Sequence, residues 1–265
     1  MELQLIPIEQ FQSFLVCTAR VGGMIGAIPV FSSAQNPARV KSALVFAMAL
    51  VLFPVMEPHI PKVSFEPGHF GILVISEVLI GSMIGLIARL IFVAVELGGQ
   101  VIGYQMGFAA ANIFDPQNES QLSLISQFQN VFAILLFLAL DGHHLFIRVT
   151  AHSFEILPPG MLNLQGEAVP FLIELSSKMF AIGIQFSAPI LVILLLSGLI
   201  LGVLARVFPQ LNVFMISFPL NIGITFTVIG LTLNLVFILL RREFGILGEN
   251  IVTMLQYLNF TGPHP

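Results

Sequence analysis

The sequence contains no tryptophan, only two tyrosines and a single cysteine among its 265 residues. One cysteine, Cys17, cannot form an internal disulfide or a Cys-based zinc or iron–sulfur site, so both kinds of site are excluded. Charge is also scarce, because 9% of the residues are Asp, Glu, Lys or Arg against roughly 25% in a soluble domain. The net charge of -4 provides no basic surface, and nucleic-acid binding is therefore set aside.

Catalytic signatures are lacking as well. The chain has no G-x-S-x-G, no H-E-x-x-H and no phosphate-binding G-x-x-x-x-G-K motif. We therefore expect neither enzyme activity nor a cofactor. The alternative on this point is an intramembrane enzyme that uses His143, His144 or His152.

Apolar residues, at 57% of the chain, dominate instead. Six apolar runs reach or approach the length of about 20 helical residues that crosses a hydrocarbon core. They cover residues 11–31, 40–56, 70–97, 124–147, 179–205 and 213–240. Because backbone groups in lipid must bond within helices, the sequence predicts an all-α membrane protein, with the runs paired as successive kinked helical hairpins. Pro189 and Pro219 lie inside the last two runs and predict kinked or broken helices there.

Two signals that usually accompany lipid-exposed helices are weak. Alternate loops carry three and five lysines or arginines, a difference too small to set the orientation of the chain in the membrane. The sequence has no tryptophan for an aromatic belt at the membrane interfaces. We interpret both as a sign that much of the apolar surface faces protein. Small residues at helical spacing favour close helix contacts. They are the pairs Gly22 and Gly26, Gly81 and Gly85, and Gly198 and Gly202, and the run Gly99, Gly103, Gly107 and Ala111.

A few charged residues lie within or beside the apolar runs. Glu77 and Arg89 share one run, and each would cost about 2.5 to 3.5 kcal/mol at a bilayer centre. A proton or ion pathway is one interpretation. We favour pairing with polar groups on neighbouring subunits, or a position near the end of a span. Arg206, at the end of the fifth run, belongs with these intramembrane or subunit-facing polar residues.

A polar stripe follows the fourth run at intervals of three, four, four and three residues. It consists of Asp141, His144, Arg148, His152 and Glu155, which this spacing places on one helix face. Imidazole and carboxylate ligands suit zinc, but Arg148 in the middle would repel a cation. We therefore expect a solvated or subunit-facing stripe and no metal.

Residues 103–116 are rich in glycine and alanine and end in the turn signal Asp115-Pro116. Bent backbone at membrane depth is tolerated only where it is buried in protein or lines a cavity, so a pore-constricting loop is a fair hypothesis for this segment. Near the C-terminus, apolar residues at three- and four-residue spacing predict an amphipathic helix over residues 244–260.

Four stretches of the sequence together resemble the R-subunit family of the flagellar type III protein-export gate. They are residues 19–44, with Arg20, Pro29, Phe31 and Pro37, and residues 77–117, 137–148 and 204–220. Their order and spacing make the resemblance specific over residues from about 19 to 220. The virulence-secretion counterpart of this subunit is an alternative, as is a small-molecule secondary transporter with paired broken helices.

The resemblance implies a single R-subunit domain over residues 1–265, at the centre of the flagellar basal body in the bacterial inner membrane. It implies assembly with homologous P and Q subunits into a helical, closed-pore complex, wrapped by other subunits and lying largely above the membrane plane. Further implied partners are a FlhB-like substrate-specificity switch protein, a FlhA-like export component and unfolded flagellar substrates. By motif, the family's pore plug falls on Gly107, Phe108, Ala109, Ala110, Ala111, Asn112, Ile113, Phe114 and Asp115. Phe108, Ile113 and Phe114 would form its apolar seal.

Overall fold

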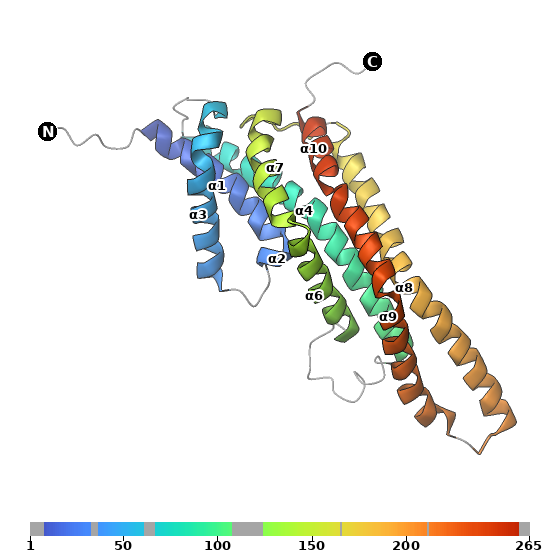
Figure 1. The fold of residues 1–265 in the computed structure, drawn as a ribbon. Coiled ribbons are helices and arrows are strands. Elements are labelled where there is room, and N and C mark those ends of the chain that lie inside the picture. Colours follow the sequence, from blue (N-terminus) through green and yellow to red (C-terminus); the bar gives the residue numbers. More distant parts are fainter. Residues whose placement is uncertain are drawn as a thin grey trace. The chain divides into compact units, whose positions relative to one another are not determined.

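A computed structural model describes residues 8–32, 37–60, 67–107, 124–164, 166–210 and 212–259. The regular secondary structure of these residues is helical, which confirms the predicted all-α class. In chain order the helices are α1 (Ile8–Ala27), α2 (Pro29–Ser32), α3 (Ala38–Met56), η1 (Glu57–His59), α4 (Pro67–Met106), α6 (Leu124–Ala139), α7 (Gly142–Ile156), α8 (Ala168–Val207), α9 (Val213–Gly245) and α10 (Leu247–Leu258) (Figure 1).

Four helical segments of the described chain are long and apolar enough to cross a membrane. They are Ala38–His59, Gly68–Met106, Ala168–Val207 and Met215–Leu258. The α6–α7 pair adds a fifth if it is counted as one broken span. The chain is therefore an all-α membrane protein, as the sequence predicts.

Two of the predicted spans take a different form. The run 11–31 forms α1, which is not among the candidate spans, and the short α2, which begins at Pro29. The run 124–147 is not one helix, because α6 ends at Ala139 and α7 begins at Gly142. Asp141 between them has a φ of 57°, a left-handed conformation that aspartate tolerates better than most residues.

Pro189 and Pro219 lie inside α8 and α9, and both helices continue through them. A proline removes one backbone N–H donor from a helix. The residues before and after it can still form their own backbone hydrogen bonds, so the helix continues. Of the two predicted alternatives, kinked or broken, the continuous helices exclude the broken one, and the kinks stay a prediction.

Packing divides the chain into two compact units. Unit 1 comprises residues 1–90, 141–176 and 244–265, and unit 2 comprises residues 91–140 and 177–243. The organisation of residues 1–265 as a single domain stays a prediction.

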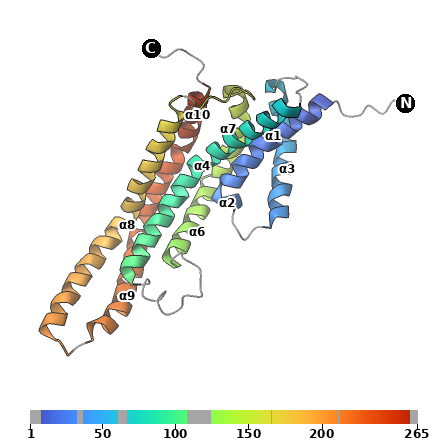
Figure 2. The ribbon, with the colours of Figure 1, turned by 180° about the vertical axis from the view of Figure 1, so that it is seen from behind.

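Unit 1 is built where α1 packs against the first part of α4, with α3, α7 and α10 in the same unit (Figure 2). A Cβ on Gly81 would overlap the backbone carbonyl of Arg20, and one on Gly85 would overlap that of Met24. The backbones of α1 and α4 are therefore in direct contact, as the Gly81 and Gly85 pair predicts. On α1 the contact is made by Gly23, whereas a Cβ on Gly26 would meet nothing within 4 Å.

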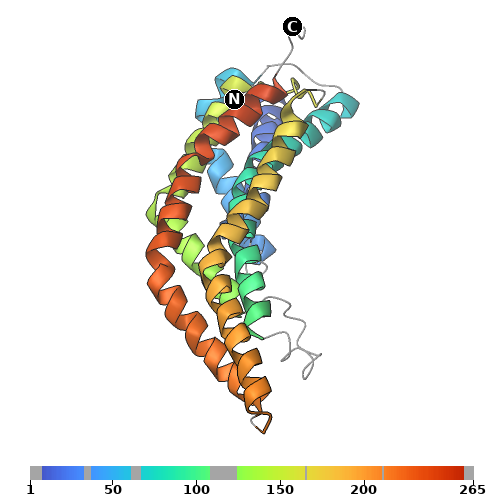
Figure 3. The same cartoon turned by 90° about the vertical axis from the view of Figure 1, so that its right-hand side faces the viewer.

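Unit 2 contains the second part of α4, α6, α8 from Ser177 to its end and most of α9. In this unit α8 and α9 run side by side as a hairpin (Figure 3). Its buried core consists of Ile102, Met106, Ile125, Ile190, Leu194, Val228 and Ile229. A Cβ on Gly98 would lie 2.9 Å from the carbonyl oxygen of Gly183, so α4 and α8 also meet backbone to backbone. Gly198 and Gly202, by contrast, have nothing within 4 Å and form no close contact in this chain.

The outer faces of α8 and α9 remain apolar. Exposed side chains on these faces include Val192, Leu195, Leu199, Phe226, Leu231 and Ile238. Leu231 is 79% exposed and Leu199 is 67% exposed. Faces of this composition require lipid or another protein around them, because contiguous apolar surface is unfavourable in water.

Candidate functional site

Gly107 ends α4 at the first residue of the predicted plug. Its N–H donates to the carbonyl oxygen of Tyr104 at 3.2 Å, and its φ of +97° lies in the left-handed region that favours glycine. A Cβ at this position would also lie 2.9 Å from Cε1 of Phe218 in α9. Glycine therefore fits here for two reasons, one conformational and one steric.

The last turns of α4 leading to Gly107 are firmly packed. Ile102 is fully buried and Met106 is 1% exposed, and both belong to the core of unit 2. One turn further back, a Cβ on Gly99 would overlap Ser126 of α6, whose hydroxyl donates to the carbonyl oxygen of Glu96 at 3.0 Å. The stem that carries the predicted plug is thus held by α6, α8 and α9.

The predicted plug itself lies almost wholly outside the described residues. Gly107 is described, and Phe108 through Asp115 are not. The plug assignment, including the seal by Phe108, Ile113 and Phe114, therefore stays a prediction.

A second polar centre lies in the interior of unit 1 at Arg20. Its Nε donates to Oε2 of Glu77 at 2.6 Å, and both side chains are fully buried. One terminal nitrogen donates to the hydroxyl of Ser153 at 3.1 Å, and the other donates to the carbonyl oxygen of Leu157 at 2.9 Å. The guanidinium carbon also lies 3.8 Å from the centre of the Phe154 ring. We call this group of residues the arginine junction.

The arginine junction joins three helices that are distant in sequence. Arg20 comes from α1, Glu77 from α4, and the hydroxyl and ring from α7. Arginine suits such a position because its planar fork donates in several directions at once. A buried charge pair is tolerated when its remaining polar atoms are also hydrogen-bonded. The Arg20 guanidinium is bonded in this way, because it also donates to the Ser153 hydroxyl and the Leu157 carbonyl oxygen.

The partner of Glu77 differs from both interpretations favoured on sequence, which were polar groups on neighbouring subunits or a position near the end of a span. The structure supplies it from the same chain, as Arg20. Sequence reasoning missed this pair because the two residues are 57 positions apart in separate apolar runs. The available signal was that Arg20 is the one charged residue of the run 11–31 and needs a partner of opposite sign.

The other polar residues singled out by sequence lie on the surface. Arg89 and Arg206 are exposed, so neither is part of the arginine junction. The stripe residues Asp141, His144, Arg148, His152 and Glu155 are all exposed as well, on the face of α7 opposite the buried Phe146 and Val149. Their spacing therefore places them together as predicted, although Asp141 precedes the helix.

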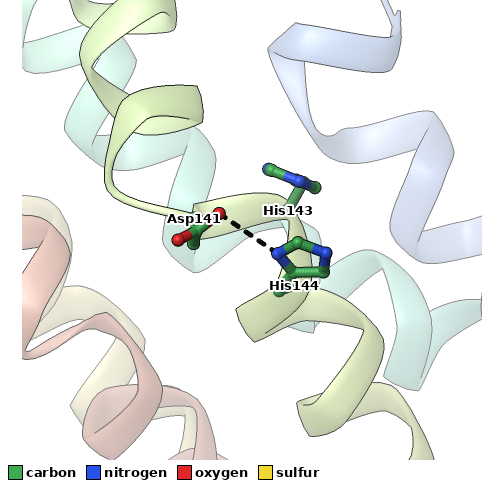
Figure 4. Close-up of side chains that lie close together, drawn as sticks. All are labelled: Asp141, His143 and His144. Atoms are coloured by element: carbon green, nitrogen blue, oxygen red, sulfur yellow. Dashed lines mark hydrogen bonds and ion pairs between the residues drawn. The ribbon is translucent and has the colours of Figure 1, made fainter.

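Two short histidine–carboxylate contacts lie along the stripe. Nδ1 of His144 lies 3.2 Å from Oδ1 of Asp141, and Nδ1 of His152 lies 2.6 Å from Oε2 of Glu155. Nε2 of His59 in η1 lies 3.9 Å from the other oxygen of Glu155. Among the described residues, Asp141, His143 and His144 bring three possible metal ligands within 4.8 Å of one another (Figure 4).

Comparison with known proteins identifies the family. The profile of the family described as bacterial export proteins, family 1, matches residues 11–246. The chain belongs to this family. The match takes in the arginine junction, the whole of α4 and the α8–α9 hairpin.

Individual relatives agree along most of their length. Flagellar biosynthetic protein FliR of Bacillus subtilis (strain 168) is 33% identical over 251 residues, covering 94% of this chain and 96% of the relative. FliR of Pectobacterium carotovorum subsp. carotovorum is 34% identical over 82% of each chain, and FliR of Escherichia coli (strain K12) is 31% identical over 82% of each. Membership of this family makes the chain a component of the flagellar protein-export apparatus.

Proposed function

We propose that this chain is the R subunit of a flagellar type III export gate and that residues 107–115 form its pore plug. The observation that carries this proposal is the end of α4, where a tightly packed stem stops at Gly107 at the start of the segment that resembles the family's plug. A plug needs a fixed base and an end that changes direction sharply. The buried Met106 and the left-handed Gly107 supply these two properties in adjacent residues.

In this mechanism the chain moves a segment and makes or breaks no bond. Phe108, Ile113 and Phe114 close the conduit, because an apolar constriction excludes water and hydrated ions. An unfolded flagellar substrate displaces the plug while the α4 stem stays in its core. The energy comes from partner proteins, since the sequence has no phosphate-binding motif.

The proposed partners are the P and Q subunits of the gate, a FlhB-like switch protein and a FlhA-like export component. The proposed place is the bacterial inner membrane at the centre of the flagellar basal body. Support comes from the exposed apolar faces of α8 and α9, which need a partner or lipid around them. A helical, closed-pore complex of homologous subunits would cover these faces.

Deletion of residues 108–115 tests the plug. In cells that also express the P and Q subunits, we expect the variant to co-purify with them as the wild type does, while the membrane becomes permeable to ions and small solutes. Phe208→Ala is the matched control, because Phe208 is an exposed phenylalanine in the connection between α8 and α9. An assembled complex whose conductance stays at the closed level, or a control that leaks equally, would overturn the assignment.

Gly107→Ala tests the base of the plug without removing the plug. A left-handed alanine costs about 1–2 kcal/mol, and its Cβ would press on the Phe218 ring. We expect a smaller leak than the deletion causes. The double variant Gly107→Ala/Phe218→Leu should keep part of that leak, because it relieves the steric contact and leaves the backbone strain.

The other functions considered receive less support. A secondary transporter would pair broken helices in matching halves, but α8 and α9 are adjacent and neither is broken at its proline. The relatives reported above are named as flagellar proteins, which favours the flagellar subunit over its virulence-secretion counterpart.

A further inference from the structure

We propose that Asp141, His143 and His144 form a binding site for a divalent transition-metal ion of the zinc type. The site lies at the start of α7 in unit 1, and its three residues belong neither to the proposed plug nor to the arginine junction (Figure 4). One carboxylate and two imidazoles are a donor set that suits zinc, cobalt and nickel. The export function does not call for these residues, so their convergence needs its own account.

The backbone at Asp141 brings the carboxylate to the imidazoles. Its left-handed φ of 57° turns the chain just before α7, and Oδ1 then lies 3.2 Å from Nδ1 of His144. Ligands of a tetrahedral zinc ion, with bonds of about 2.0–2.2 Å, are separated by about 3.4 Å. The two atoms therefore already have the spacing of two ligands of one ion.

His143 supplies the third ligand. Its ring lies against that of His144, with ring centres 4.1 Å apart and planes inclined by 37° (Figure 4). The three ligand atoms all lie within 4.8 Å of one another.

An unsatisfied atom at His143 provides an independent observation. Its Nδ1 is buried and has no hydrogen-bond partner among the residues that the structure describes. Buried polar nitrogens are nearly always bonded, so this atom calls for a ligand. A metal ion bound at this cluster would give His143 a partner.

This proposal departs from the expectation from sequence, which excluded a metal because of Arg148, and the surrounding charges do limit the affinity. Arg148 lies four residues after His144 on the same exposed face, and the N-terminus of α7 carries a partial positive charge. Arg148 and the helix N-terminus both repel a cation, and the single carboxylate of Asp141 neutralises only part of the charge of a divalent ion. The exposed Asp141 and His144 leave the remaining coordination position to water, so we expect an open site of moderate affinity.

The stripe offers a matched control. His152 and Glu155 repeat the chemistry of His144 and Asp141, at the same three-residue spacing and with a 2.6 Å contact. His59 approaches that pair only to 3.9 Å from the second carboxylate oxygen, and the described residues form no three-ligand group there. A site that depends on three ligands should respond to His143 and ignore His152.

The test uses the full chain in detergent, with an affinity tag that contains no histidine, after treatment with EDTA. Cobalt(II) is titrated and followed by its visible absorption, and zinc is measured by its displacement of cobalt. We expect one cobalt ion per chain, at least tenfold weaker binding in Asp141→Asn, His143→Gln and His144→Gln, and unchanged binding in His152→Gln. Each variant must elute and melt like the wild type in EDTA to be compared.

His143→Cys tests coordination directly. A thiolate at residue 143 that binds cobalt produces a charge-transfer band in the near ultraviolet, and this band appears only if that side chain is a ligand. The proposal is overturned if His143→Gln binds cobalt as tightly as the wild type, if His152→Gln loses as much affinity, or if the cysteine variant binds cobalt without this band. Because binding is measured on the isolated chain, the result is independent of the plug assignment.

Discussion

Arg20 and Glu77 show how single residues control the stability of unit 1. Their side chains are fully buried and 2.6 Å apart, and the guanidinium is bonded to α7 at two further points. An ion pair in this setting is not worth much relative to a well-packed apolar pair, because both charges lose their water. Its removal from one side only, however, leaves an unpaired buried charge.

We predict that Glu77→Gln destabilises the chain by about 3–5 kcal/mol, because Arg20 then keeps its charge without a carboxylate. The melting temperature in detergent and the rate of limited proteolysis measure this loss. Arg89→Gln, on the same helix but exposed, is the control and should change little.

The double variant Arg20→Met/Glu77→Met separates charge from packing. It should be more stable than Glu77→Gln, because no charge remains buried. If Glu77→Gln has the same melting temperature as the wild type, the ion pair does not stabilise the fold, and the structural role of the arginine junction is contradicted.

Cys17 allows a second measurement in the same unit. It lies in α1, outside the candidate spans, with Sγ 3.3 Å from Sδ of Met56. Burial raises the pKa of the Cys17 thiol to about 12 from its ordinary value of 9.0, against a smaller lowering by Arg20. The folded thiol therefore keeps its proton where an exposed thiol would lose it.

We predict that Cys17 resists maleimide at pH 8 in the folded chain and reacts fully after unfolding in denaturant. The same shift makes the folded state less stable as pH rises from 9 towards 12, since the unfolded chain releases a proton in that range and the folded chain does not. Labelling followed by mass spectrometry measures the first effect, and Cys17→Ser removes the label. Rapid labelling of native protein would contradict the buried position.

At the scale of helices, the glycines of α4 decide where backbones touch. Gly81 and Gly85 face α1, Gly98 faces α8 and Gly99 faces α6, so one helix uses different glycines for different neighbours. A methyl group at any of these points meets backbone atoms of the next helix, which cannot move aside as a side chain can.

We predict that Gly81→Ala strongly destabilises unit 1, because its Cβ would overlap the carbonyl of Arg20 and displace the arginine junction. Gly198→Ala is the matched control. It is also a helix glycine, but nothing lies within 4 Å, and alanine is the better helix former by about 1 kcal/mol. Thermal melting of both variants gives the comparison, and equal melting temperatures would contradict the close contact of α1 and α4.

At the scale of the whole molecule, the chain leaves a large apolar surface exposed, which is unfavourable in water. The described residues of α3, α8 and α9 carry many large apolar side chains with more than half their surface exposed. Neither unit can cover them by itself. Lipid, or the sister subunits proposed above, must do so.

Leu231, which is 79% exposed, tests this demand. A glutamate at this position costs about 2.5–3.5 kcal/mol in hydrocarbon. Its burial against an apolar protein surface is also unfavourable, because the carboxylate loses its water there. We predict that Leu231→Glu lowers co-purification with the P and Q subunits at least tenfold, while Leu231→Ala assembles normally. Equal recovery of the two variants would mean that this face of α9 lies in water.

The class of the protein follows from its amino-acid composition and hydropathy. Low charge and long apolar runs suffice to predict an all-α membrane protein, because lipid permits few other ways to bond a backbone. The order of short motifs also sufficed to predict the export-gate family, which the match over residues 11–246 confirms. The stripe on α7 followed from helical spacing alone, since its residues are close in sequence.

Tertiary structure alone decided which residues meet. Hydropathy could not find the break at Asp141, because apolar residues continue on both sides of a turn set by one backbone angle. It could not choose Gly23 over Gly26, since that depends on how α1 and α4 are rotated about their axes. Nor could it pair Arg20 with Glu77 across 57 residues. Spacing along a chain specifies the face of one helix, and only the packing of helices specifies what that face contacts.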